Sequence, residues 1–116
     1  MDIRELIIDD RVSHNGDIGK VVEIKTTHVR LMFKDGASYL YNVNELEPIP
    51  ITDKLIKKIG FTPMGDSRFA LTDAALLKYD AINYMFVTRY THKLIKYLHQ
   101  LQHEIWEAGI ELKIEL

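Results

Sequence analysis

The residues with the clearest chemical potential lie in the C-terminal part of the chain. His99, His103 and Glu107 recur at intervals of four residues, so on a helix their side chains approach one face. Imidazole nitrogens and a carboxylate at this spacing can ligate a divalent metal ion. Gln100 and Leu101 follow His99, however, which does not match the zinc-binding helix of metalloproteases. We therefore interpret these residues as a polar helix surface and expect no metal site and no cofactor.

No arrangement of residues in the sequence predicts catalysis. The serines Ser13, Ser38 and Ser67 have no recognisable base partner, and no Gly-x-Ser-x-Gly motif occurs. The sequence contains no phosphate-binding loop, and no motif places a pair of carboxylates. Cysteine is absent, which excludes a disulfide framework and thiolate zinc ligands. We therefore expect a protein that is not an enzyme.

A second group of residues has the chemistry of a binding surface. Tyr39 and Tyr41 alternate along one predicted strand and therefore share a face. Arg30, Lys34 and His28 lie near them in the sequence and could add positive charge. Small barrels use such aromatic and basic surfaces to bind peptides or to stack on nucleic-acid bases. The alternative is that one or both tyrosines are partly buried with satisfied hydroxyls.

The helix expected within residues 91–108 has two apolar faces. The first is an aliphatic stripe of Leu94, Leu98, Leu101 and Ile105. The opposite face carries Ile95, His99, His103 and Trp106. Because tryptophan is enriched in interface cores, we expect Trp106 to be largely buried. The cover could be the N-terminal region, a second subunit in a homodimer or an external partner.

The fold that must position these residues is best marked between Asp9 and Pro50. Asn15-Gly16 and Asp35-Gly36 predict hairpin turns, because such turns need positive φ angles. Alternating strands are predicted over residues 17–24, 28–33 and 37–41, with a single 3₁₀ turn over 42–46 and a last short strand over 47–49. Short strands at this spacing predict a closed, SH3-like β-barrel over residues 1–50.

The remaining residues, 51–116, predict a separate α+β domain. Thr52 is a candidate N-cap and Gly60 a candidate helix end, so a short helix is expected between them, over residues 53–59. The stretch 61–90 favours an antiparallel meander with a turn at Pro63–Asp66.

Two segments of this second domain carry further predictions. Residues 74–79 are open between strand and helix, since Ala-Ala-Leu-Leu has helical propensity. Ile110–Leu116 alternates between apolar and charged residues and predicts a half-buried strand that closes a small antiparallel sheet. The C-terminal helix is expected to pack on this sheet.

Three stretches of the chain carry a resemblance to known proteins. They are NGDIGKVVEI at residues 15–24, LEPIPIT at 46–52 and IKYLHQLQ at 95–102. Together they resemble a group of short proteins common in gut Bacteroidota and in their phages and mobile elements. The resemblance implies that the last helix begins near Tyr97 and that residues 91–95 are extended. It implies no particular activity.

Composition limits the classes of function. The 116 residues include 15 Lys and Arg against 17 Asp and Glu, a net charge of −2, which argues against a general nucleic-acid binder. No signal peptide is visible, and no apolar run is long enough to span a membrane. We therefore expect a cytoplasmic protein without a membrane partner.

The resulting hypothesis is a non-enzymatic binding or adaptor protein of a phage or mobile element, with an unidentified protein as its partner and a homodimer as an option. One alternative is an anti-defence sponge that captures a small nucleotide. The other is a small-barrel module that binds nucleic acid. The candidate binding residues are Tyr39, Tyr41, Arg30, His99, His103 and Trp106.

Overall fold

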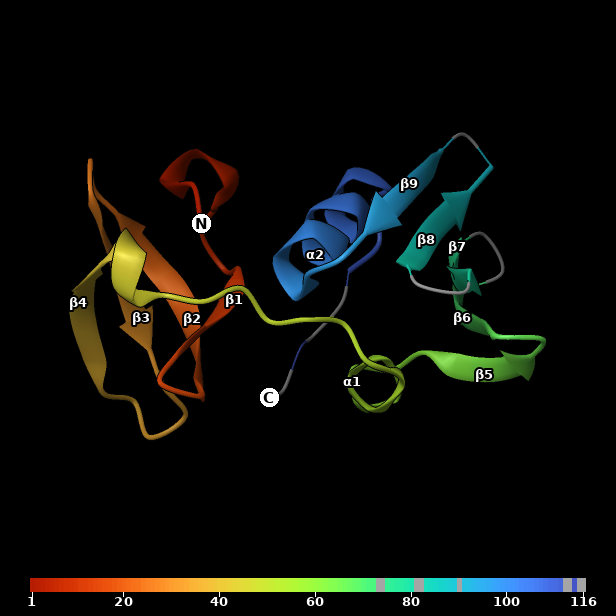
Figure 1. Cartoon of the computed structure of the whole chain (residues 1–116), viewed down its shortest axis with the longest axis horizontal. Coiled ribbons are helices and arrows are strands. Elements are labelled where there is room, and N and C mark those ends of the chain that lie inside the picture. Colours follow the sequence, from red (N-terminus) through yellow and green to blue (C-terminus); the bar gives the residue numbers. More distant parts are fainter. Residues whose placement is uncertain (73–74, 81–82, 90, 112–113, 115–116) are drawn as a thin grey trace. The chain divides into compact units, whose positions relative to one another are not determined.

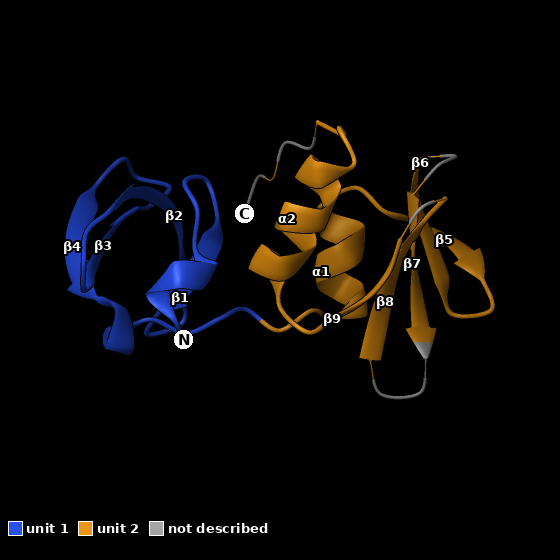
Figure 2. Cartoon of the chain, turned by 90° about the horizontal axis from the view of Figure 1, so that it is seen from above, with its two compact units in different colours: residues 1–49, 116 blue, residues 50–115 orange. Residues whose placement is uncertain are grey.

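A computed structural model of the chain describes residues 1–72, 75–80, 83–89, 91–111 and 114. The chain divides into two compact units, Met1–Ile49 and Pro50–Glu115, which are coloured separately in Figure 2. Each unit contains one antiparallel sheet, with four strands in the first and five in the second (Figure 1). The described part of the second unit also contains a short helix and a C-terminal helix, so the fold is α+β, as predicted.

The first unit is a meander of four strands. They are β1 (Arg11–His14), β2 (Asp17–Ile24), β3 (His28–Met32) and β4 (Ser38–Asn42), with the 3₁₀ turns η1 (Ile3–Glu5) before them and η2 (Val43–Glu45) after them. Each strand pairs antiparallel with the next. Because side chains alternate along a strand, one face of the sheet supplies most of the aliphatic core. The buried core residues are Leu6, Val12, Val21, Val29, Leu31 and Leu46.

Both predicted hairpin turns are present, and they differ in geometry. Asn15 and Gly16 have φ angles of 50° and 86°, as a two-residue type I′ turn requires. In the second hairpin the left-handed residue is Gly36, with a φ of 87°. Phe33 N–H donates to the Ala37 carbonyl over 2.9 Å, which closes a three-residue loop of the type I class.

No closed barrel is detected in this unit. β1 and β4 are the two edges of the sheet and do not pair with each other. The strand predicted over residues 47–49 is reduced to one bridge, in which Ser13 and Glu47 exchange two backbone hydrogen bonds of 2.9 Å. Pro48 and Pro50 flank the segment, and proline fixes φ and has no N–H, so a longer ladder is disfavoured there.

The second unit places both helices on the same side of a five-stranded sheet (Figures 1 and 2). The strands are β5 (Thr62–Gly65), β6 (Arg68–Thr72), β7 (Ala75–Asp80), β8 (Asn83–Thr88) and β9 (His92–Ile95), and the helices are α1 (Asp53–Lys58) and α2 (Leu98–Glu107). Each strand pairs antiparallel with the next, which confirms the predicted meander. Of the segment 74–79, residues 75–79 are therefore strand rather than helix, because they are paired on both sides, and residue 74 lies outside the described residues.

Side chains cap the start of both helices, and for α1 they are the ones that the sequence predicts. Thr52 Oγ1 accepts a hydrogen bond from the Leu55 N–H over 3.2 Å, and Gly60, with a φ of 116°, follows the last turn of α1. Gln100 Oε1 accepts from the N–H groups of Lys96 and Tyr97, over 3.0 and 3.2 Å. These bonds fix the start of α2 after Tyr97, where the resemblance places it.

The turn predicted at residues 63–66 lies later in the chain than expected. Thr62–Gly65 forms β5, and the turn consists of Asp66 and Ser67, whose φ angles are 51° and 57°. β5 is an edge strand, where proline is tolerated because the ladder needs no donor on its outer side. Pro63 was therefore a misleading turn signal.

Two predictions about the last helix and strand also fail. Leu94 and Ile95 belong to β9 and not to the helix, and Leu94 is exposed. The extended conformation that the resemblance implies for residues 91–95 is confirmed over 92–95. Gly109 has a φ of 76°, and the Ile110 N–H donates back to the Ile105 carbonyl over 3.1 Å, which ends α2 in a Schellman-type cap. Residues 110, 111 and 114 lie outside any strand, and the rest of the predicted strand lies outside the described residues.

Candidate binding site

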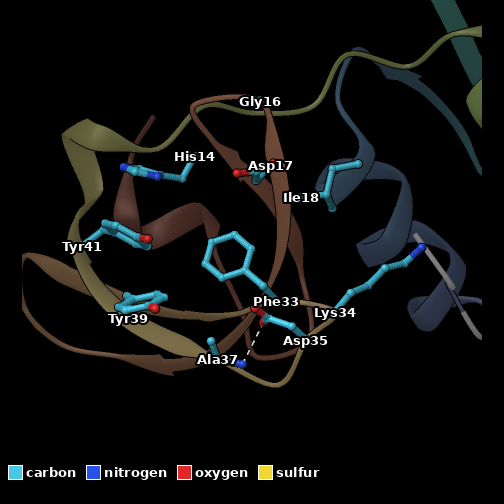
Figure 3. A pocket seen from close by; sticks show the side chains of 10 residues that line it. All are labelled: His14, Gly16, Asp17, Ile18, Phe33, Lys34, Asp35, Ala37, Tyr39 and Tyr41. Carbon is cyan, nitrogen blue, oxygen red and sulfur yellow. Dashed lines mark hydrogen bonds between the residues drawn. The ribbon is translucent and has the colours of Figure 1, made fainter.

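The inner face of the first unit's sheet ends in an open hollow of about 570 Å³ (Figure 3). It is lined by His14, Gly16, Asp17, Ile18, Phe33, Lys34, Asp35, Ala37, Tyr39 and Tyr41. These residues come from the ends of three strands and from the two hairpin turns. The whole site therefore lies within the first unit.

The alternation of side chains along the strands places the residues of the core and those of the hollow on the same face of the sheet. On β1, buried Val12 is followed on the same face by His14, and buried Leu31 of β3 is followed by Phe33. Leu31 also pairs directly with Tyr39 of β4. The aliphatic core thus gives way to aromatic residues toward one end of the sheet, where nothing in the unit covers it fully.

Four rings in the hollow contact one another. His14 and Tyr41 are stacked, with centroids 4.0 Å apart and planes 22° apart. Phe33 lies 6.3 Å from Tyr39 and 6.4 Å from Tyr41, and the two tyrosine rings are 6.3 Å apart. Figure 3 shows His14, Tyr41 and Tyr39 in one column with Phe33 beside it. The rings hold one another in place and form one continuous aromatic surface.

Gly19 allows Phe33 to lie close to β2. A Cβ on this glycine would lie 2.9 Å from Leu31 Cβ and 3.2 Å from Phe33 Cε1. Such distances are too short for carbon atoms, so any other residue would displace the ring or the strand. In the sequence, the only signal for this role is a glycine inside a strand pattern.

The two tyrosines of the hollow differ in burial. Tyr39 is 55% exposed, whereas Tyr41 is half-buried against His14. Burial raises the pKa of the Tyr41 phenol, and the neighbouring Tyr39, Glu45 and Asp17 add to the rise. Within the described part of the chain, no hydrogen bond occupies the hydroxyl of either tyrosine.

The charged groups of the hollow are unevenly arranged. The carboxylate of Asp17 points toward the rings in Figure 3, whereas the side chain of Lys34 extends away from them. Asp35 Oδ1 accepts a hydrogen bond from the Ala37 N–H over 2.9 Å, so this carboxylate stabilises the turn. The rings therefore face a carboxylate, and the lysine among the lining residues is directed elsewhere.

The structure brings Tyr39 and Tyr41 together but places Arg30 on the other face of the sheet. Arg30 pairs with Leu40 rather than with a tyrosine, and its Nε lies 3.2 Å from Glu23 Oε1. Successive residues of a strand point to opposite faces, so Arg30 cannot share the tyrosines' surface. The aromatic and basic patch that the sequence suggested does not form with Arg30.

The second face predicted for the last helix is a row of rings along α2. Ring centroids are 6.0 Å apart for Tyr97 and His99, 6.0 Å for His99 and His103, and 6.2 Å for His103 and Trp106. His99 is buried, whereas His103 and Trp106 are only half-buried. Within the single chain Trp106 is therefore not largely buried, and its cover by a second subunit or a partner stays a prediction.

The described residues contain no metal site and no membrane-spanning helix. Among them, no group of three or more His, Cys, Asp or Glu side chains could hold a metal ion, and Glu107 is exposed at the end of α2. No described helix is both long and apolar enough to cross a bilayer.

The second unit has a tyrosine-lined hollow of its own, of about 650 Å³. Its lining residues are Pro50, Ile51, Thr52, Asp53, Tyr79, Asn83, Tyr84, Ile95, Lys96 and Tyr97. Here the Tyr84 hydroxyl donates to Asp53 Oδ1, and the Tyr84 ring lies 4.9 Å from that of Tyr79. Burial raises the pKa of Tyr84 well above its usual range, and the hydrogen bond to Asp53 adds to the rise. Tyr84 therefore joins β8 to the start of α1.

Comparisons with known proteins add no family to this description. No protein-family model, no curated protein and no solved structure matches the chain. A function must therefore be inferred from the chemistry of the chain's own residues.

Proposed function

We propose that the first unit is a binding module that holds a segment of another protein in the aromatic hollow. The observation that carries this proposal is the open hollow in which exposed Tyr39 lies against the half-buried rings of His14, Phe33 and Tyr41. Rings that are already fixed by their neighbours bury a large area on binding at a small cost in conformational entropy. Aromatic residues are accordingly enriched among the residues that dominate binding energy at interfaces.

The proposed role is non-enzymatic. The lining residues include no serine, threonine or cysteine that could act as a nucleophile. His14, the one imidazole in the hollow, has its ring stacked on Tyr41. These features suit a contact surface better than a reaction centre.

A protein ligand fits the hollow better than a nucleic acid or a nucleotide. Asp17 and Asp35 outnumber Lys34 among the lining residues, and carboxylates repel phosphate groups. The second unit's hollow is no better suited to an anion, since Lys96 is its only lysine or arginine and Asp53 lies in the same lining. We therefore favour the protein partner over the nucleotide sponge and over the nucleic-acid module.

We also propose that the first unit is an SH3-like small barrel in which residues 47–49 close onto β1. Three features support this: the antiparallel meander of four strands, the 3₁₀ turn η2 after β4, and the bridge between Glu47 and Ser13. An adaptor role in a phage or mobile element rests on the resemblance of the three sequence motifs.

Selection from a random peptide display library tests the binding function. The full-length chain should enrich peptides with a shared consensus, and the Tyr39→Ser variant should not retain them. Tyr79→Ser is the matched control, because Tyr79 is a partly exposed tyrosine in the second unit; this variant should retain the same peptides. Circular dichroism of all three proteins checks that each is folded. Failure to enrich any consensus, or equal retention by Tyr39→Ser, would refute the proposed function.

A further inference from the structure

We propose that the segment held in the aromatic hollow carries an arginine side chain, which lies on the ring surface beside the carboxylate of Asp17. This inference rests on the proposed binding function and adds the chemistry of the ligand. The proposal follows from which charged side chains lie next to the rings of the hollow.

The rings supply the first half of the site. The face of an aromatic ring carries partial negative charge and attracts a cation placed over it. The Tyr39 ring is more than half exposed, and the neighbouring rings of Phe33 and Tyr41 extend the same surface. A guanidinium group is planar and weakly hydrated, so it stacks on such a surface more readily than an ammonium group does.

Asp17 supplies the second half. It is the first residue of β2 and pairs with His14, so its carboxylate lies at the edge of the ring column. Figure 3 shows this carboxylate pointing toward the rings. Asp17 is exposed, and none of the ion pairs among the described residues includes it. A guanidinium that lies on the rings can donate hydrogen bonds to this carboxylate at the same time.

The other charged groups of the hollow do not fill these roles. The Lys34 side chain extends away from the rings, so it does not neutralise Asp17 (Figure 3). The Asp35 carboxylate already accepts the Ala37 N–H, 2.9 Å away. The hydroxyls of Tyr39 and Tyr41 add further acceptors for the remaining N–H groups of a guanidinium. The arrangement therefore selects a cation and, among cations, one with several donors.

Chemical-shift titration of the full-length chain tests this assignment. The probes are acetyl-Pro-Pro-Arg-Pro-Pro-amide and the same peptide with citrulline, which keeps the shape of arginine and removes its charge. Proline keeps the probe extended and lowers its ordering cost. The arginine peptide should shift the signals of His14, Gly16 and Tyr39 and bind about fivefold more tightly than the citrulline peptide.

The variant Asp17→Asn should remove this preference for arginine. Asp66→Asn is the matched control, since it makes the same change at an exposed turn residue of the second unit, outside the hollow, and it should retain the preference. Equal binding of the two peptides to the wild type, lost in Tyr39→Ser, would overturn the arginine assignment and leave the binding function intact. Absence of shifts with both peptides, or shifts with a short oligothymidylate instead, would overturn the assignment as well. The display selection then decides separately whether the hollow binds protein segments at all.

Discussion

In the first unit, Tyr39 and Tyr41 pack against other rings, and their hydroxyls have no hydrogen bond among the described residues. In the second unit, the Tyr84 hydroxyl donates to Asp53, and only 8% of Tyr84 is exposed, against 55% of Tyr39. A buried tyrosine whose hydroxyl has a partner inside the fold stabilises that fold. An exposed tyrosine whose hydroxyl has no partner inside the fold can offer both its ring and its hydroxyl to a ligand. The comparison suggests a structural role for the second hollow and a binding role for the first.

The same substitution in each hollow tests this difference most directly. Tyr84→Ala should lower the free energy of unfolding of the full chain by about 3 kcal/mol, because it removes a buried ring and leaves a cavity. Tyr39→Ala should change it by no more than about 0.5 kcal/mol, as at other surface positions. Urea unfolding of both variants measures the two values. Equal losses would show that the two tyrosines are equivalent.

The glycine turn at the edge of the first hollow predicts the next largest effect. Gly16 has a φ of 86°, and the turn joins His14 to Asp17, so its geometry places both lining residues. Gly16→Val should cost about 1–2 kcal/mol, because a β-branched residue is strained at positive φ. Thermal melting measures the loss. Gly16→Asn is the control and should cost less, since asparagine tolerates this conformation; the same cost for both variants would contradict the turn assignment.

Much of the fold could be predicted from local signals. The turn at Asn15-Gly16, the cap at Thr52 and the glycine after α1 each depend on a few adjacent residues, and the structure confirms them. The failure at Pro63 needed information from farther away, because Pro63 lies in a strand that is at the sheet edge. At residue 110 a local signal outweighs the alternation, since Gly109 lets the Ile110 N–H donate back to the Ile105 carbonyl.

Only part of the candidate site could be predicted from the sequence, because the rest depends on contacts between strands that are distant in the chain. Alternation placed Tyr39 and Tyr41 on one face, but sequence proximity wrongly added Arg30, which pairs with Leu40. His14 could not be assigned to the site, because β1 and β4 are not adjacent strands and only the curvature of the sheet brings His14 onto Tyr41. Strand periodicity gives the face of a residue and not its partners across a sheet.

Alkaline pH should separate the two kinds of tyrosine. The pKa of Tyr84 is raised in the folded state above the ordinary value of about 10, so its contribution is fully present below pH 10 and is lost as the pH rises further. Between pH 9 and pH 11 the wild type should lose about 1 kcal/mol more stability than Tyr84→Phe does. Urea unfolding at the two pH values measures this. Tyr39→Phe should keep the wild-type dependence, and a similar flattening there would contradict the assignment to Tyr84.

The smallest expected effect concerns the second position of the two-residue hairpin turns, where the two units have different residue types. The first unit has glycine at the second turn position, whereas the second unit has Ser67, with a φ of 57°. A residue with a side chain is disfavoured in the left-handed region, so Ser67→Gly should relieve that cost. Glycine also increases the entropy of the unfolded chain, which offsets part of the gain and leaves a net stabilisation of about 0.5 kcal/mol. The Ser67 carbonyl, which accepts the Tyr79 N–H over 2.8 Å, is unchanged by the substitution.

Thermal melting of Ser67→Gly beside Ser67→Ala measures the effect, because alanine keeps the conformational cost. If the glycine variant is no more stable than the alanine variant, the left-handed turn at Asp66 and Ser67 does not strain the second unit.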